Sequence, residues 1–529
     1  MIHFRKAYII SFIILLPFLS FLFPYLSRIQ FDNPEAIVHH SLNTDYVKIT
    51  VTYNAAPSIS SGPSDGNSTS STPTNVGSDV TFSATSTDAE SNSWKLLVCK
   101  TSSAPTASTT TPTCSGGSSN LWCVSSSWAS STNQNTCTYT ALVGDVESNV
   151  WYAFSCDNNA APNCSTSSQG SGDSGSPFNV NHSPTITSIG TTPTSIDPGA
   201  TVTFTATSSD TDTDPSADTV KLLVCKTSGL SGTTCTGDTW CGITSLVASN
   251  PSCTSTAPTA AGSNSYYVYV LDNHSLSATA TSSTFTVNNA TPSVGVISVG
   301  SVSLSESSTT TATSSVTVSD NNGCTNIASI TAVFYDSNAT SATCGQNNNS
   351  CYASIACSTS TCDGNDSAAS CTAYPWYYAN ASNGWKWQIK ATDSASASST
   401  NTSGTTTIAA LIALEVNETT INYGTGLLPG ATSSQATTTI ENTGNTNLDV
   451  DTYGTAMSCT AGTIAVGQQK FNTGGGETAL TGVAQTIDLN VAQRITTVPT
   501  GSVYWKLYAP TNIKGTCSGT NTFEAKNGG

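Results

Sequence analysis

Charged side chains are scarce in this chain. Asp, Glu, Lys and Arg make up 9% of its 529 residues, against about 25% in ordinary soluble proteins. The 15 Lys and Arg residues are outnumbered by 32 Asp and Glu residues, which gives a net charge of -17. The cations are also scattered, whereas a nucleic-acid-binding protein needs clustered cations to displace counterions from phosphates. The composition therefore excludes a nucleic-acid partner.

Histidine and helical periodicity are also lacking. No stretch after residue 54 has apolar residues at the 3.6-residue spacing of an amphipathic helix. The five histidines are scattered, at His3, His39, His40, His182 and His274. Zinc sites favour paired C-x₂₋₄-C spacings, often with histidine. Cys357 and Cys362 come near that spacing, but no second such pair follows, so we expect disulfides rather than zinc.

Cysteine, in contrast, is abundant, with 18 residues. Paired cysteines indicate an oxidising compartment outside the cytosol. Their number is even in each of four successive segments, as pairing within single domains requires. The four groups are Cys99, Cys114, Cys123, Cys137, Cys156 and Cys164; Cys225, Cys235, Cys241 and Cys253; Cys324, Cys344, Cys351, Cys357, Cys362 and Cys371; and Cys459 and Cys517.

The first two groups suggest a connectivity. Cys156 and Cys164 have no counterparts in the second group, which indicates that they bond to each other. The four cysteines shared by the two groups allow three pairings. Among these we favour bonds between neighbours, Cys99–Cys114 with Cys123–Cys137, and Cys225–Cys235 with Cys241–Cys253.

The N-terminus has the pattern of a membrane anchor or a signal peptide. Arg5 and Lys6 precede an uncharged run over residues 7–26, which is long enough to span a bilayer. The positive end should stay cytoplasmic and send the rest of the chain outside. No A-x-A cleavage site follows, so we favour an uncleaved anchor. We assign residues 1–28 to this segment and 29–54 to a stem.

Three internal repeats follow the stem, at residues 55–181, 182–289 and 290–410. The strongest match is Lys-Leu-Leu-Val-Cys-Lys-Thr at residues 95–101 and again at 221–227. Each repeat also has an alternating β-branched block and a late aromatic segment, at 150–154, 266–270 and 385–389. Alternation with period two predicts half-buried strands, and several short strands per repeat predict a β-sandwich. The Asn- and Pro-containing junctions favour extended linkers.

Residues 411–529 form a fourth block with a different pattern, including an Asn-Thr-Gly-Asn turn at 442–445. This block resembles the Hydin-type immunoglobulin-like domains of bacterial surface proteins. The three repeats resemble the immunoglobulin-like and PKD-like repeats of prokaryotic surface proteins, without the usual PKD tryptophan signature. The resemblance implies an all-β chain of tandem, disulfide-stapled immunoglobulin-like sandwiches at the cell surface, and it implies no activity.

One short motif is similar to a catalytic one. Gly-Asp-Ser-Gly-Ser-Pro at 172–177 resembles the nucleophile segment of trypsin-like proteases, whose serine needs a histidine and an aspartate. His39 and His40 lie beside the membrane segment without the family's surrounding residues. Repeat alignment also places Ser174 just before a closing strand at 178–180. We therefore expect no catalytic role and no enzyme.

Acidic residues recur at two places in each repeat. In an immunoglobulin-like sandwich the loops after strands B and F lie at the same pole, so the two sets are expected to converge. Clustered carboxylates suit Ca²⁺, while Asp is also a common turn residue, and both interpretations stay open. The candidate calcium ligands are Asp88, Glu90 and Asp157; Asp210, Asp212, Asp214 and Asp272; and Asp320 and Asp393.

These observations predict a structural or adhesive cell-surface or secreted protein, tethered to the membrane only through residues 7–26. The alternative is a protein that binds carbohydrate or another cell surface through exposed aromatics such as Trp122, Trp128 and Trp376. Trp122 aligns with Trp240, each beside a cysteine, which favours packing against a disulfide for that pair. Trp128 and Trp376 have no clear counterparts.

Overall fold

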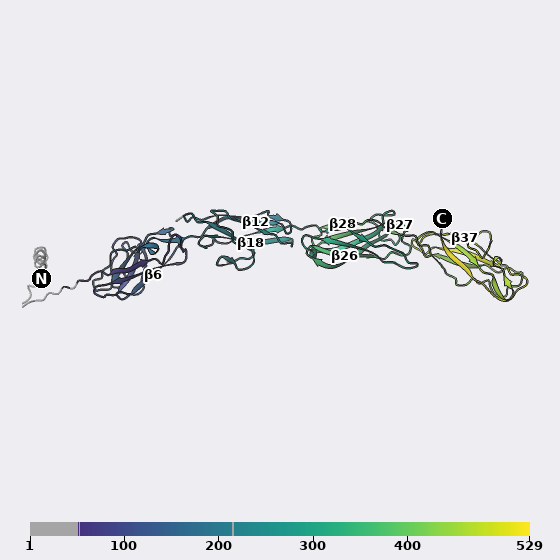
Figure 1. The fold of residues 1–529 in the computed structure, drawn as a ribbon, viewed down its shortest axis with the longest axis horizontal. Coiled ribbons are helices and arrows are strands. Elements are labelled where there is room, and N and C mark those ends of the chain that lie inside the picture. Colours follow the sequence, from purple (N-terminus) through teal and green to yellow (C-terminus); the bar gives the residue numbers. More distant parts are fainter. Residues whose placement is uncertain (1–50, 52, 214–215) are drawn as a thin grey trace, which may run out of the picture. The chain divides into compact units, whose positions relative to one another are not determined.

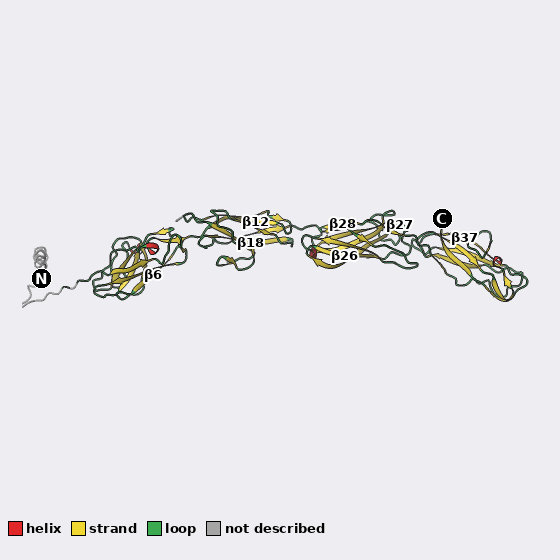
Figure 2. Cartoon of the chain, viewed as in Figure 1, coloured by secondary structure: helices red, strands yellow, loops and turns green. Residues whose placement is uncertain are grey.

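The structure, a computed structural model, describes residues 51, 53–213 and 216–529. The chain divides into two units, Met1–Ala55 and Ala56–Gly529, and the domains below belong to the second. The chain is all-β, built of tandem immunoglobulin-like β-sandwiches with disulfides (Figures 1 and 2). The predicted anchor at 7–26 lies outside the described residues. Among those described, no helix is long and apolar enough to span a membrane.

Repeat 1 has three small sheets, with strand orders β1-β3-β6, β5-β4-β8 and β2-β9-β7. β2 and β9 pair in parallel, and the other pairs are antiparallel. Two short 3₁₀ turns, Gly117–Asn120 and Gly172–Ser174, lie in its loops. The strands are β1 (Ser58–Ser64), β2 (Thr74–Asn75), β3 (Asp79–Thr87), β4 (Trp94–Cys99), β5 (Leu121–Val124), β6 (Gln134–Thr140), β7 (Ser148–Asn149), β8 (Tyr152–Asp157) and β9 (Phe178–Asn181).

Repeat 2 has two main sheets, β10-β12-β17 and β11-β19-β18-β13-β16, and a small hairpin, β14-β15. β11 again pairs in parallel with the closing strand, β19. The strands are β10 (Thr185–Thr192), β11 (Ser195–Ile196), β12 (Thr201–Ser209), β13 (Val220–Cys225), β14 (Leu230–Ser231), β15 (Thr234–Cys235), β16 (Thr239–Cys241), β17 (Ser252–Thr256), β18 (Gly262–Asp272) and β19 (Thr281–Val287).

Repeat 3 pairs β20-β22-β26-β25 in one sheet, with β21 also on β22, and β24-β23-β27-β28 in the other, with β29 also on β27. A 3₁₀ turn at Cys324–Asn326 precedes β23. The strands are β20 (Ser293–Val294), β21 (Ser298–Val299), β22 (Ala312–Ser319), β23 (Ile327–Asp336), β24 (Cys351–Ala356), β25 (Ser358–Asp363), β26 (Asp366–Ala373), β27 (Ser382–Asp393), β28 (Ser398–Thr402) and β29 (Thr406–Ile408).

The C-terminal domain has sheets β30-β31-β38-β35-β36, β37-β32-β40 and β34-β33-β39. A 3₁₀ turn at Val466–Gln468 precedes β35. The strands are β30 (Leu414–Val416), β31 (Ala436–Asn442), β32 (Leu448–Gly454), β33 (Met457–Ala461), β34 (Thr463–Ile464), β35 (Gln469–Asn472), β36 (Thr478–Ala479), β37 (Gln485–Val491), β38 (Thr500–Leu507), β39 (Lys514–Ser518) and β40 (Asn521–Asn527).

The alternation read from the sequence decides which side chains enter each core. Along β12 the side chains of Val202, Phe204 and Ala206 are buried, and those between them are not. Successive side chains of a strand point to opposite faces of the sheet, so one face of β12 is apolar and the other polar. Strand β4 of repeat 1 is instead buried at all of its positions, including Lys95. One of its faces, with Leu96 and Val98, enters the main core, and the other, with Leu97 and Cys99, packs in a second apolar cluster.

Aromatic side chains from both sheets meet in the centre of repeats 1 and 2. In repeat 2 the ring of Phe204 on β12 lies 5.1 Å from Tyr266 and 5.8 Å from Phe285, centroid to centroid, in edge-on geometry. Repeat 1 uses Phe82, Trp151 and Phe178 in the same way, at 5.3 and 5.8 Å. Such edge-on pairs contribute beyond the area that they bury. The same three-ring contact therefore lies at the centre of the core in both repeats.

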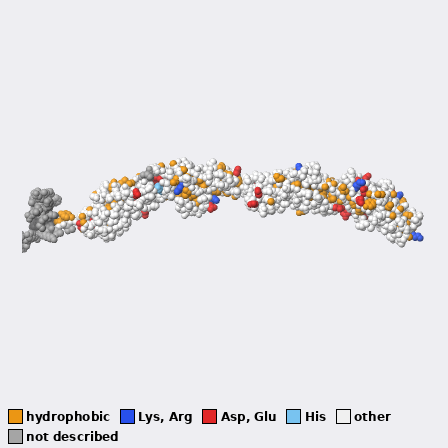
Figure 3. Space-filling view, viewed as in Figure 1, with side chains coloured by type: hydrophobic (Ala, Val, Ile, Leu, Met, Phe, Trp, Pro, Cys, Tyr) orange, Lys and Arg blue, Asp and Glu red, His pale blue; other side chains and the backbone are white. Residues whose placement is uncertain are grey.

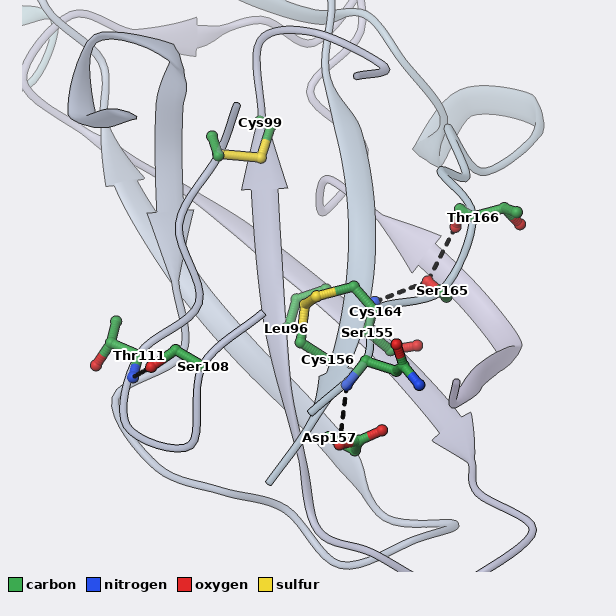
Figure 4. The surroundings of a disulfide bond; sticks show 12 residues. Leu96, Cys99, Ser108, Thr111, Ser155, Cys156, Asp157, Cys164, Ser165 and Thr166 are labelled. Atoms are coloured by element: carbon green, nitrogen blue, oxygen red, sulfur yellow. Dashed lines mark hydrogen bonds between the residues drawn. A yellow bond between two sulfur atoms is a disulfide. The ribbon is translucent and has the colours of Figure 1, made fainter. Parts of the chain in front are cut away.

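The cysteines form nine disulfides, each between cysteines of the same domain, and no free cysteine remains. In repeats 1 and 2 they join sequence neighbours, which is the pairing that the sequence favours. The remaining bonds are Cys324–Cys362, Cys344–Cys351, Cys357–Cys371 and Cys459–Cys517. Figure 4 shows Cys156–Cys164, which ties the loop after β8 to that strand, beside Ser165 and Asp157.

Because each domain has its own core, we predict that Phe204→Ala destabilises repeat 2 alone. Removing a fully buried phenylalanine costs about 3–5 kcal/mol of unfolding free energy. Hydrogen exchange measured by mass spectrometry on residues 55–529 should show faster exchange in 182–289 and unchanged protection elsewhere. The exposed Val296→Ala is the control. Loss of protection in all four domains would show that their cores are coupled.

Candidate functional site

The candidate carboxylates lie directly at strand ends. Asp210 follows β12, and Asp272 is the last residue of β18. Asp88 and Asp320 likewise follow β3 and β22, and Asp157 and Asp393 end β8 and β27. Asp157, Asp272, Asp320 and Asp393 have at most 2% of their surface exposed. These groups are therefore buried parts of the fold rather than mobile loop residues.

Each of these aspartates also organises its own turn. Oδ1 of Asp88 accepts hydrogen bonds from the backbone N–H groups of Glu90 and Asn92, at 2.9 and 3.0 Å. Oδ1 of Asp272 accepts from Leu276 N, and Oδ1 of Asp393 from Ala397 N, at 2.9 and 2.8 Å. Asp side chains commonly stabilise turns in this way. In each case one carboxylate oxygen, Oδ1, accepts the hydrogen bonds of the turn, and the other oxygen, Oδ2, can interact with another group.

In repeat 2 three carboxylates gather at one point. Oxygens of Asp210, Asp212 and Asp218 lie within 4.8 Å of one another. The sequence prediction included Asp210 and Asp212, but not Asp218. Asp218 lies in the same loop as Asp210 and Asp212, two residues before β13 begins at Val220, and this position in the loop was the only indication in the sequence. Asp214 lies outside the described residues, and Glu90, at the corresponding loop of repeat 1, is exposed.

Hydrogen bonds hold this cluster in place. His182 donates its backbone N–H to Asp212 Oδ2 at 2.6 Å, and its Nδ1 lies 2.9 Å from Asp212 Oδ1. With the Asn273 amide turned so that its nitrogen faces Asp218, it donates to both carboxylate oxygens at 3.0 and 3.1 Å. Nε2 of His274 lies 3.9 Å from Asp218 Oδ1. The carboxylates are therefore positioned from the residues around them.

Burial and mutual repulsion disfavour the charged forms of these carboxylates. Burial, and to a smaller extent the neighbouring charges of Asp212, Asp272 and Asp218, raise the pKa of Asp210 to about 6, although a backbone hydrogen bond from Asp212 lowers it. Burial also raises the pKa of Asp218 and of Asp272, partly offset for Asp218 by His274 and for Asp272 by Asn181. A cation placed among these groups would favour their charged forms.

The aromatic candidates differ in environment. Trp122 is 8% exposed, packs on Phe178 at 4.9 Å and donates Nε1–H to Val150 O. Trp240 does the same with Phe285 and Ser265 O. This pair is structural packing. Trp128 is partly exposed, with Lys95 Nζ 5.2 Å from its ring centre.

Trp376 is the more exposed candidate. It is 36% exposed and stacks on Tyr378 at 5.9 Å, and Tyr374, two residues earlier in the same loop, is 59% exposed. Charged side chains are sparse on the face shown in Figure 3, so aromatic rings are among the few distinctive surface groups. Exposed aromatic faces of this kind can stack on a flat apolar ligand surface.

Among the described residues, the protease-like motif forms a turn that is bonded to a neighbouring loop of repeat 1. Ser174 lies in a 3₁₀ turn just before β9, as the repeat alignment predicts. Its hydroxyl donates to the side-chain oxygen of Asn67 rather than to a histidine. Ser174 O also accepts from Asp65 N at 3.0 Å. The segment thus closes the loop that carries Asp65.

A cavity of about 590 Å³ lies in the C-terminal domain. Tyr423, Met457, Gln469 and Phe523 are among the side chains that line it. Its only carboxylate, Glu418, accepts from Thr439 N and from Thr439 Oγ1. The lining thus pairs its acid with a threonine, which is a structural contact and not an acid–base pair.

No family model matches the sequence, and no curated protein matches it. Among solved structures, a tetra-tandem repeat from the extending region of a large adhesion protein covers 89% of this chain and 98% of its own, at 14% identity and a TM-score of 0.29. Fibronectin(III)-like modules of Clostridium thermocellum CbhA cover 44% and 94%, at 16% identity and a TM-score of 0.19.

Three N-terminal domains of the bacteriophage RB49 outer capsid protein Hoc cover 64% of this chain and 95% of their own, at 13% identity and a TM-score of 0.19. All three similarities are to proteins of repeated β domains. Their identities and TM-scores are too low to carry an argument about function.

Asp65 gives repeat 1 a predictable pH dependence. It is 1% exposed, its Oδ2 lies 3.3 Å from Trp151 Nε1, and burial raises its pKa to about 6. A carboxyl group whose pKa is higher folded than unfolded stabilises the fold in its protonated form. That stability, of order 3 kcal/mol, is full below about pH 4 and is lost as the pH rises through 6.

We therefore expect Asp65→Asn to flatten this dependence, since its side chain stays neutral. Calorimetric melting of residues 55–529 at pH 4 and pH 7 should show a smaller drop for the repeat 1 transition in the variant than in the parent. The exposed Asp173→Asn should behave like the parent. An equal drop in the parent and in Asp65→Asn would contradict the assignment.

Proposed function

We propose that this chain is a non-enzymatic structural or adhesive protein of the cell exterior, in which the sandwiches form a stalk or coat. The observation that carries the proposal is the tandem arrangement of domains, each with its own core and each closed by disulfides within itself. Disulfides persist outside the reducing cytosol. Separate cores let domains be added in series without changing their neighbours.

Tethering by residues 7–26 and a Hydin-type identity for residues 411–529 belong to the same proposal. The uncharged run after Arg5 and Lys6 supports the tether. The turn at 442–445 between β31 and β32 supports the domain type. A tethered stalk needs only one attachment point, which this arrangement supplies.

A stalk should be extended in solution. A compact globule of the size of residues 55–529 would have a radius of gyration of about 23 Å. We predict that small-angle scattering of this fragment gives a value at least twice as large, with a distance distribution that has a long tail. A value near that of the globule would reject the stalk, although it would leave the separate sandwiches in place.

The second candidate function is binding of carbohydrate or of another cell surface. The exposed aromatics Tyr374 and Trp376 favour it, since they lie together in the loop after β26. Flat aromatic faces suit the apolar faces of sugar rings. The stacking of Trp376 on Tyr378 favours a different role for Trp376, which is packing within this loop.

A glycan array separates the two functions. The structural proposal predicts no saturable binding by residues 55–529 to any glycan, and no difference between the parent and Trp376→Ala. Val296→Ala, also at an exposed position, is the matched control. Saturable binding that Trp376→Ala abolishes and Val296→Ala retains would replace the structural proposal with the binding one.

A further inference from the structure

The junctions before repeats 2 and 3 are built on the same hydrogen bonds. Before repeat 3, Asn289 Nδ2 donates to Asp393 Oδ2 at 2.8 Å. The backbone N–H of the next residue, Ala290, donates to Asn322 Oδ1 at 2.6 Å. Asp393, at the end of β27, is in register with Ile327, the first residue of β23. The junction asparagine is thus fixed to the pole of the repeat that follows it.

One further amide completes the junction before repeat 3. Asn326 lies directly before β23, and its Nδ2 is 3.2 Å from Asp320 Oδ2 and 3.4 Å from Asn289 Oδ1. Asp320 Oδ1 already accepts from Asn322 N at 2.8 Å. Both oxygens that face Asn326 therefore have a donor, and the buried polar groups here are satisfied by the protein itself.

The junction before repeat 2 repeats the first of these bonds. Asn181 Nδ2 donates to Asp272 Oδ2 at 2.9 Å, and His182 N donates to Asp212 Oδ2 at 2.6 Å. Asp272, at the end of β18, is in register with Val220, the first residue of β13. Asn181, Asp210, Asp212 and Asp272 therefore take the places of Asn289, Asp320, Asn322 and Asp393.

Repeat 2 has no side-chain amide at the position that corresponds to Asn326. Thr219, and not an asparagine, lies directly before β13. The two oxygens that correspond to those bonded by Asn326, Asp210 Oδ2 and Asn181 Oδ1, are buried and have no hydrogen-bond partner. Asn181 is 1% exposed. Asp218 adds a further carboxylate at this point. Buried oxygens without a partner are costly, so these two require a hydrogen-bond donor or a cation, and the clustered carboxylates favour a cation.

We propose that Asn181, Asp210, Asp212 and Asp218 form a calcium site at the junction before repeat 2. All four offer oxygen, the donor that Ca²⁺ prefers. The carboxylate oxygens of the three aspartates lie within 4.8 Å of one another, which is compatible with ligand distances of 2.3–2.6 Å to one Ca²⁺. His182 is not available as a nitrogen ligand for zinc, because its ring nitrogens face Asp212 Oδ1 and Asp145 O.

The space at this point suits a single ion. Three of the four proposed ligands, Asn181, Asp212 and Asp218, line a small cavity together with Glu147 and His274, whereas Asp210 is not among its lining residues. The cavity has a volume of about 10 Å³, which is enough for one water molecule or one ion. Asn181 belongs to the closing strand of repeat 1, whereas the three aspartates belong to repeat 2. An ion here would bind both repeats at once and restrict their relative motion.

The test is calorimetric titration of residues 55–529 with calcium chloride. We expect one saturable binding event per chain for the parent, and at least tenfold weaker binding for Asp210→Asn and for Asp218→Asn. Asp320→Asn is the matched control, because Asp320 takes the place of Asp210 in repeat 3 but already has an amide partner. It should bind calcium like the parent. Magnesium chloride should bind at least tenfold more weakly.

A second measurement does not depend on the variants folding well. Calcium that binds only the folded chain should raise the melting temperature of the parent's repeat 2 transition with increasing concentration, and a chelator should reverse the shift. Absence of both the heat and the melting shift in the parent overturns the proposal, and leaves a buried water as the partner of the two oxygens. Equal calcium binding in the parent, Asp210→Asn and Asp218→Asn also overturns it.

Discussion

The contact between the two sheets of each sandwich is the interaction on which the rest of this protein depends. In repeat 2, Phe204 on one sheet touches Tyr266 and Phe285 on the other, and repeat 1 has the equivalent three rings. Ion pairs add little to stability, since only 9% of the residues are charged and exposed ion pairs contribute little. Aromatic burial and the disulfides around it therefore carry each domain.

The ends of the sandwiches, in contrast, contain buried charged groups, which are unfavourable unless they have partners. There β12 and β22, in the place of strand B, are followed by aspartates, and β18 and β27, in the place of strand F, end in aspartates. These aspartates shape the following turns, and burial of those turns takes the carboxylates out of water. In repeat 3 side-chain amides satisfy these carboxylates, since Asn326 donates to Asp320 and Asn289 donates to Asp393. Repeat 2 has more negative charge at the same place, with Asp212 and Asp218. The two poles thus share a backbone design but differ in how their charge is balanced.

Much of the fold could be predicted from the sequence, because the signals are local. The identical segments at 95–101 and 221–227 became the matching strands β4 and β13, and the alternation in 202–206 became the buried face of β12. The disulfides of repeats 1 and 2 join neighbours in sequence. Cys324–Cys362 spans 38 residues across a hairpin of repeat 3, and no local pattern predicts it.

The candidate site could be predicted only in part, for the same reason. The convergence of strands B and F at one pole follows from topology, so Asp210 and Asp272 could be named together. Asp218 and Asn181 could not, since their roles depend on where the loop before β13 returns and on how the preceding repeat ends. For Trp122 the alignment with Trp240 already favoured packing, and its contacts with Phe178 and Val150 O agree with that interpretation.

The difference between the two junctions bears on how a string of such domains behaves. Amide bonds such as those of Asn326 form whenever the chain is folded, so the junction before repeat 3 has one fixed set of partners. A junction that leaves two buried oxygens without a donor has a partner only when the solution supplies one. With the proposed calcium site, the junction before repeat 2 would be stiff only in the presence of the ion, while the junction before repeat 3 has its partners within the chain. The two junctions share one sequence pattern, and they differ in the residue just before β13 or β23, which is Thr219 in repeat 2 and Asn326 in repeat 3.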